Sequence, residues 1–174
     1  MKRKITEGYI YSRSAAQRIF DAEVKRVDIY ANSVLVIFEK GQKLRPRFVA
    51  KSAFKEHFAR WRQGKARTEV IVSYRPLNGT FHAIKSSNIT EYYQIELYPD
   101  HLTCTCKDYE IQEELGIEKP ACKHIYATLD YIGCTSIADY IERDGMSFLD
   151  TNETLHQWND PLKDYHDEMM SYGY

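Results

Sequence analysis

Glycine is scarce in this sequence, with eight residues among 174, and most of them stand at predicted turns. No glycine-rich phosphate loop of the P-loop type is present, so nucleotide hydrolysis has little support. No run approaches the roughly 20 consecutive apolar residues of a membrane-spanning helix, and Met1-Lys-Arg-Lys4 is not followed by the apolar stretch of a secretory signal. We therefore expect an intracellular protein, in the cytoplasm and nucleoid or in the nucleus, without a membrane partner.

Net charge is also nearly absent, at −1, but the charges are divided along the chain. Residues 1–75 hold 18 Lys and Arg against 7 Asp and Glu, a balance of +11. The balance is −2 over residues 76–103 and −10 over residues 104–174. This division suggests a polyanionic partner for the first half, and we place a boundary near residues 76–86, where the sign changes.

Apolar periodicity and turn residues predict an α+β fold, with small mixed or antiparallel sheets and helices. A capping box at Ser14–Gln17 predicts a first helix over residues 14–26. Two strands within residues 27–39 follow, joined by a turn at 31–33. A second helix carries Ala50, Ala53, Phe54, Phe58 and Trp61 on one stripe and ends at Gly64. Further strands are predicted at 70–74, 80–84, 92–98 and 102–106, and helices at 108–115, 122–132 and from Ser136 to near Gly145.

Three cysteines and a histidine form two closely spaced pairs, Cys104-Thr-Cys106 and Cys122-Lys-His124, with fifteen residues between them. Two such pairs separated by a loop are typical of a tetrahedral structural zinc site. Because three thiolates and an imidazole fill all four positions, a catalytic zinc with an open position is disfavoured. The alternative is a set of buried cysteines and a core histidine without metal. Cys134 is expected to be a small buried hydrophobe.

The residues around these pairs resemble the SWIM zinc finger. The resemblance rests on YQIELYPDHLTCTCKDY from Tyr93 and PACKHIYATL from Pro120, and it covers residues 86–132. It implies a CxC pair on a β-hairpin, a CxH pair opening a helix, and one structural Zn²⁺ held by Cys104, Cys106, Cys122 and His124. It also implies nucleic-acid binding or protein contact, since such modules occur in transposases, chromatin remodellers, recombination mediators and ubiquitin-ligase-type proteins. Three thiolates and a zinc ion carry a formal charge of about −1. Lys107 and Lys123 are expected either to offset this negative charge or to be ordinary solvent-exposed lysines.

The basic half is densest from Lys40 to Arg67, with ten Lys and Arg in 28 positions. Phosphate neutralisation by such residues supplies most non-specific affinity for nucleic acid. Lys51, Lys55 and Arg62 fall on one flank of the second helix, where they would form a basic ridge. Core packing is expected for Phe54, Phe58 and Trp61, while Phe48 is undecided. The candidate nucleic-acid contacts are Lys43, Arg45, Arg47, Lys51, Lys55, Arg60, Arg62, Lys65 and Arg67; a solvated basic face is the alternative.

These observations predict three regions: a basic α+β region over 1–85, a SWIM-like module with a trailing helix over 86–145, and an acidic, aromatic tail over 146–174. The favoured function is a non-enzymatic zinc-binding protein that binds nucleic acid, DNA in preference to RNA, through its basic half. The competing function is a protein–protein adaptor that uses the SWIM surface and the acidic tail. Neutralisation of about six phosphates would give a slope of log affinity on log salt near −5 for duplex DNA.

Overall fold

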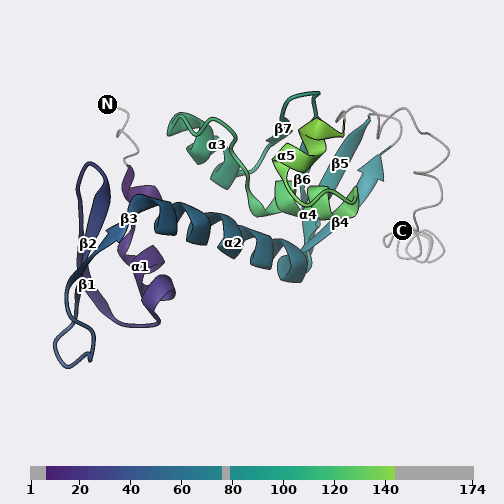
Figure 1. The fold of residues 1–174 in the computed structure, drawn as a ribbon. Helices are drawn as coiled ribbons and strands as arrows, with labels where there is room; N and C mark the ends of the chain where they lie inside the picture. The colour runs from purple at the N-terminus through teal and green to yellow at the C-terminus, as the bar shows by residue number, and fades with distance from the viewer. Residues whose placement is uncertain (1–6, 76–78, 144–174) are drawn as a thin grey trace, which may run out of the picture. The chain divides into compact units, whose positions relative to one another are not determined.

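The computed structural model describes residues 7–75 and 79–143 (Figure 1). The chain divides into two compact units. The first unit comprises Met1–Gly64 and Glu114–Gly116, and the second comprises Lys65–Glu113 and Ile117–Tyr174. The boundary predicted near residues 76–86 falls inside the second unit, and the predicted tail, 146–174, lies outside the described residues. The fold is α+β, as predicted, with two small antiparallel sheets. None of the helices in the described ranges is long and apolar enough to cross a membrane.

The first unit packs two helices against a three-stranded antiparallel sheet. Its elements are the 3₁₀ turn η1 (Glu7–Tyr9), α1 (Arg13–Phe20), β1 (Val24–Ile29), β2 (Ser33–Phe38), β3 (Arg47–Ala50) and the greater part of α2 (Lys51–Glu69), and the strand order is β1-β2-β3. Alternation along β2 buries Val34, Val36 and Phe38, which form a core with α1 and with Phe54 of α2. Period-two burial gives this sheet one core face and one outer face.

The first helix is shorter than the sequence pattern predicts. It starts after Ser12, whose hydroxyl accepts the amide of Ala15 at 3.2 Å, so Ser12 and not Ser14 is the N-cap. It ends at Asp21, which has a positive φ of 47° and closes the helix in the left-handed conformation. Val24, predicted to continue the helix, is fully buried in β1. The apolar spacing across residues 16–27 therefore comes from a helix followed by a strand.

The second helix continues beyond the glycine that was predicted to end it. Helix α2 runs from Lys51 to Glu69, and Gly64 lies inside it. A glycine within a helix costs only about 1 kcal/mol relative to alanine, and Ala66, two residues further, is 1% exposed in the core of the second unit. Burial of the following turn thus offsets the glycine. Directly before the helix lies β3, a strand that the sequence pattern did not predict.

The second unit is a four-stranded antiparallel sheet covered by helices. Its elements are β4 (Val70–Arg75), β5 (Thr80–Lys85), β6 (Asn88–Leu97), β7 (Leu102–Cys104), α3 (Lys107–Glu114), α4 (Lys123–Tyr131) and α5 (Ile137–Glu142). The strand order is β4-β5-β6-β7, and α4 contacts all four strands. Phe81, Ile95, Ile125 and Leu129 are buried in their shared core. The four predicted strands and three predicted helices are present here, and Ser136 caps α5 as predicted.

Candidate functional site

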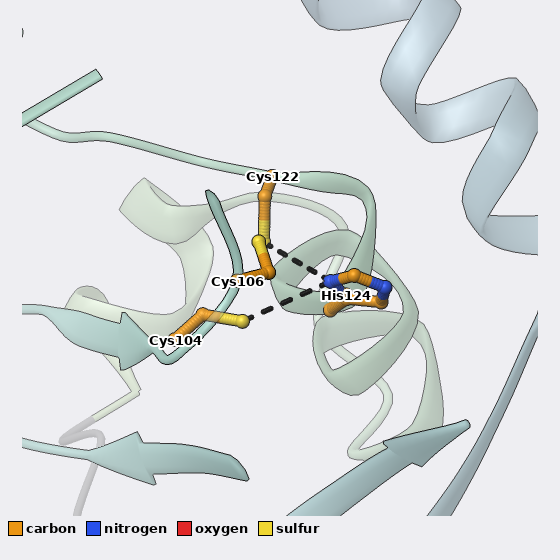
Figure 2. Close-up of side chains that lie close together, drawn as sticks. All are labelled: Cys104, Cys106, Cys122 and His124. Atoms are coloured by element: carbon orange, nitrogen blue, oxygen red, sulfur yellow. Dashed lines mark hydrogen bonds between the residues drawn. The ribbon is translucent and has the colours of Figure 1, made fainter. Parts of the chain in front are cut away.

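The four predicted metal ligands come together from three elements of the second unit. Cys104 ends β7, Cys106 precedes the first residue of α3, and Cys122 is the N-cap of α4, with His124 in that helix's first turn. Figure 2 shows the three sulfur atoms and the imidazole turned toward a common centre. Their ligand atoms all lie within 4.8 Å of one another, and all four side chains are buried. The end of β7 and the short segment before α3 thus supply one pair, and the entry of α4 supplies the other.

The distances within the cluster fit a tetrahedral zinc ion. The Nδ1 atom of His124 lies 3.8 Å from the Sγ atoms of both Cys104 and Cys122. Zn–S and Zn–N bonds of about 2.3 and 2.0 Å in a tetrahedron place sulfur and nitrogen about 3.5 Å apart, so only a small contraction is needed. Nδ1 would therefore be the ligand atom toward a bound zinc ion. Within the described part of the chain Nε2 has no hydrogen-bond partner.

The chemistry of the three thiols also points to a cation. A hydrogen bond with Cys106 raises the pKa of the Cys104 thiol to about 12, and the same contact lowers the pKa of Cys106. Burial raises the pKa of Cys122 well above its usual value. Burial and the neighbouring thiols thus oppose the ionisation of Cys104 and Cys122 unless a positive charge is present. A bound Zn²⁺ would stabilise all three as thiolates, and the residues fit a structural zinc ion.

Two side chains outside the ligand set hold the cluster in place. The ring of Tyr93, on β6, stacks on the imidazole of His124 with centroids 4.4 Å apart. Gln112 of α3, 2% exposed, accepts the amide of Ala121 through Oε1 at 3.0 Å and so fixes the chain just before Cys122. Tyr93 lies within the stretch that resembles the SWIM finger. Gln112 carried no sequence signal, because its partner is nine positions away in an irregular segment.

Both lysines beside the ligands are paired with acids. Lys123 is 25% exposed at its side chain and donates to Glu69 Oε2 at 2.9 Å, and Glu69 also pairs with Lys65. These two hydrogen bonds lower the pKa of Glu69 to about 2. Lys107 is exposed and pairs with Glu110 at 2.8 Å. The charge of the zinc centre is thus not offset by unpaired lysines.

Two further residues near the motif lie outside the ligand set. Cys134 is 2% exposed and packs in the core of the second unit, as predicted for a small buried hydrophobe. His101 is exposed, forms a 2.7 Å contact with Asp100 and stacks on Tyr98. Neither residue joins the cluster of four, so the coordination set is the one that the two pairs predicted.

The predicted phosphate-contacting residues are in very different environments. Four are exposed and have no acidic partner among the described residues: Lys43, Arg45, Arg47 and Lys55. Four others are paired with acids: Lys51 with Glu7, Arg60 with Glu56, Lys65 with Glu69 and Arg67 with Asp130. Lys65 and Arg67 also belong to the second unit. The sequence pattern gave no means of separating these groups.

The prediction that Arg62 contributes to an exposed basic ridge is wrong. Its side chain is 4% exposed, its guanidinium carbon lies 3.3 Å from the centre of the Phe58 ring, and Nη1 donates to the carbonyl of Phe58 at 3.2 Å. Tyr9 meets Phe58 edge to face and supplies a second contact to the guanidinium. Helical spacing put Arg62 on the flank of the apolar stripe, and that flank is covered by Phe58 of the same helix and by Tyr9 of η1.

The aromatic residues of the basic segment are split between core and surface. Phe54 is fully buried in the core, as predicted, whereas Phe58 is only half-buried and packs against Tyr9 and Arg62. Trp61 is 39% exposed, so the prediction that it packs in the core is wrong. The guanidinium carbon of Arg18 lies 4.7 Å from the centre of the Trp61 ring. Phe48, which the sequence left undecided, is 65% exposed on β3. At least two aromatic rings of this segment therefore reach the surface.

Comparison with known proteins identifies one part of the second unit. Residues 93–133 match the family model of the SWIM zinc finger, and this range contains all four clustered ligands. Searches of curated proteins and of solved structures found no match. The agreement between the matched range, the CxC and CxH pairs and the buried Cys₃His cluster shows that residues 93–133 form a SWIM zinc finger with a structural zinc site.

Proposed function

We propose that this protein is a non-enzymatic nucleic-acid-binding protein whose first unit contacts phosphate and whose SWIM zinc finger is a scaffold or a second contact surface. A SWIM finger is a zinc-binding interaction module for nucleic acids or proteins, and a filled coordination set leaves no position for a reacting water. The choice between nucleic acid and protein then depends on the charges that the described residues expose.

The exposed cations of the first unit carry the proposal. Residues 7–64 contain 12 Lys and Arg against 6 Asp and Glu, and Lys43, Arg45, Arg47 and Lys55 are exposed without an acidic partner in the described ranges. Lys43 and Arg45 lie in the loop between β2 and β3, and Arg47 begins β3. Such unpaired cations release bound counterions from DNA when they neutralise phosphates, which is the main source of non-specific affinity.

The second unit is a weaker candidate for phosphate contact. Residues 65–143 contain 8 Lys and Arg against 12 Asp and Glu, and several of the basic residues, including Lys65, Arg67 and Lys123, are ion-paired. Repulsion between acidic side chains and phosphate opposes binding there. The zinc finger therefore organises its own unit, and the first unit supplies the main electrostatic contact.

Salt-dependent binding of the purified full chain to a labelled DNA duplex tests this proposal. The four cations without a described acidic partner, with or without the weakly paired Arg60, predict a slope of log affinity on log salt of about −3.6 to −4.5. Arg45→Ala should make that slope shallower by about 0.9. The matched control is Lys85→Gln, an exposed lysine of β5, which should leave the slope unchanged. A flat salt response, or no binding at about 50 mM salt, would refute the proposal.

DNA is proposed in preference to RNA because the transposases, remodellers and recombination mediators in which SWIM modules occur act on DNA. Competition of unlabelled duplex DNA and duplex RNA against the same labelled duplex tests this preference. Stronger competition by DNA is expected, and equal or stronger competition by RNA would contradict it.

A further inference from the structure

The outer face of the β1–β2–β3 sheet presents aromatic rings to solvent. Strand register places Asp28 opposite Leu35 and Leu35 opposite Phe48, so these residues share a face. Val34 and Val36, their neighbours on β2, point to the other face and into the core. Alternation thus sends Phe48 and the adjacent outer-face residues away from the core of the unit.

Two rings dominate this outer face. Phe48 is 65% exposed, and Tyr30, directly after β1, is 50% exposed. Their ring centroids lie 5.6 Å apart at an interplanar angle of 65°, so they meet edge to face above the middle strand. Each ring is supported by the other, while the exposed fractions leave ring surface open to a ligand.

Two exposed cations that have no acidic partner among the described residues lie close to Phe48 in the sequence. Arg45 and Lys43 are exposed in the loop that leads into β3, three and five residues before Phe48. Three extended residues span about 10 Å, which is within reach of the phosphates that flank a base on the ring. Arg26 lies on the same outer face, opposite Ile37, and pairs with Asp28 at 3.3 Å. Aromatic surface beside unpaired cations suits a ligand with flat apolar groups on a polyanionic chain.

We propose that the outer face of this sheet, centred on Tyr30 and Phe48, is a base-stacking platform for single-stranded nucleic acid, with Lys43 and Arg45 as its phosphate contacts. This inference rests on the proposed nucleic-acid binding and adds the form of nucleic acid and the stacking residues. A duplex is excluded from the platform because its base faces are already stacked inside the helix. A single strand offers those faces, and stacking on aromatic side chains is tolerant of sequence.

The test compares the affinity of the full chain for an oligo-dT single strand and for a duplex. Phe48→Ala should weaken oligo-dT binding about 5-fold to 150-fold and leave duplex binding within about twofold. The salt slope of the oligo-dT complex should stay the same, because no cation has been removed. Phe48→Tyr keeps the ring and should restore the affinity. Tyr30→Ala should repeat the effect of Phe48→Ala.

A matched control removes an exposed ring elsewhere. Tyr92 is 57% exposed on β6, and Tyr92→Ala should leave oligo-dT affinity unchanged. If the wild-type chain binds neither probe, the proposed function itself fails, and this inference with it. If it binds duplex with the predicted salt slope while Phe48→Ala binds oligo-dT as well as the wild type does, only the platform is overturned. An equal loss for both probes overturns it as well.

Discussion

Replacement of Cys122 by serine separates the role of the metal from every other role of that side chain. Cys122 is fully buried and is the N-cap of α4, yet its side chain makes no capping hydrogen bond. Serine is nearly the same size and a better N-cap, by up to about 1 kcal/mol. Burial of its hydroxyl costs about 1–3 kcal/mol. Without a metal, Cys122→Ser should therefore cost no more than about 3 kcal/mol.

With a zinc ion the expected cost is far larger. Structural zinc contributes an apparent 10–16 kcal/mol or so in small zinc modules, whereas a domain's net stability is about 5–15 kcal/mol. Loss of one thiolate from the site should therefore unfold the zinc-binding part of the second unit at 25 °C, as should a strong chelator or His124→Ala. The assay is zinc content per chain together with unfolding followed by circular dichroism.

Cys134→Ser is the matched control for this substitution. Cys134 is 2% exposed in the same core but lies outside the ligand set. Its replacement should cost only the hydroxyl penalty of about 1–3 kcal/mol and leave zinc content unchanged. A metal-free wild-type protein, or a Cys122→Ser variant as stable as Cys134→Ser, would refute the assignment of a structural zinc site.

Two predictions concern ion pairs and pH. Glu69→Gln removes the pairs with Lys65 and Lys123 and should lower stability by up to about 1 kcal/mol at low salt. Because the pKa of Glu69 is lowered to about 2, the stability advantage of the wild type over Glu69→Gln should be present above about pH 4.5 and fade toward pH 2. The same advantage should vanish in 1 M salt. An advantage that persists in 1 M salt would contradict this reasoning. Burial, Arg18 and Arg60 lower the pKa of His57, so the folded state resists its protonation and stability should fall as the pH drops below about 6.5. In His57→Gln, urea unfolding at pH 7.5 and 5.5 should show a smaller drop than in the wild type, and an equal drop would contradict the assignment.

Short-range patterns predicted the zinc site and most of the second unit. A metal ligand set depends on spacing, and the CxC and CxH pairs keep that spacing whatever the surrounding fold does. Ser136 likewise identified the start of α5, because an N-cap is an interaction over three residues. The strands around Phe81 and Ile95 alternate with turns, so their positions also follow from local sequence.

Patterns that mix two periods misled the prediction in the first unit. Apolar residues from Ala16 to Val27 fit helical spacing, but the helix ends at Asp21 and Val24 begins a strand. Gly64 resembles a helix stop, but the helix continues because the next turn is buried at Ala66. At Gly64, tertiary packing outweighed a local preference of about 1 kcal/mol.

The sequence by itself determined the four zinc ligands, the α+β class and the basic character of the first half, since these depend on residue type and spacing. Only the tertiary structure decided which basic residues are available: Arg62 is enclosed by aromatic rings, whereas Arg45 is exposed. It also placed Tyr30 beside Phe48 across a strand. Exposure and such pairings depend on residues far apart in the chain, and a count of charges or a helical wheel contains no information about them.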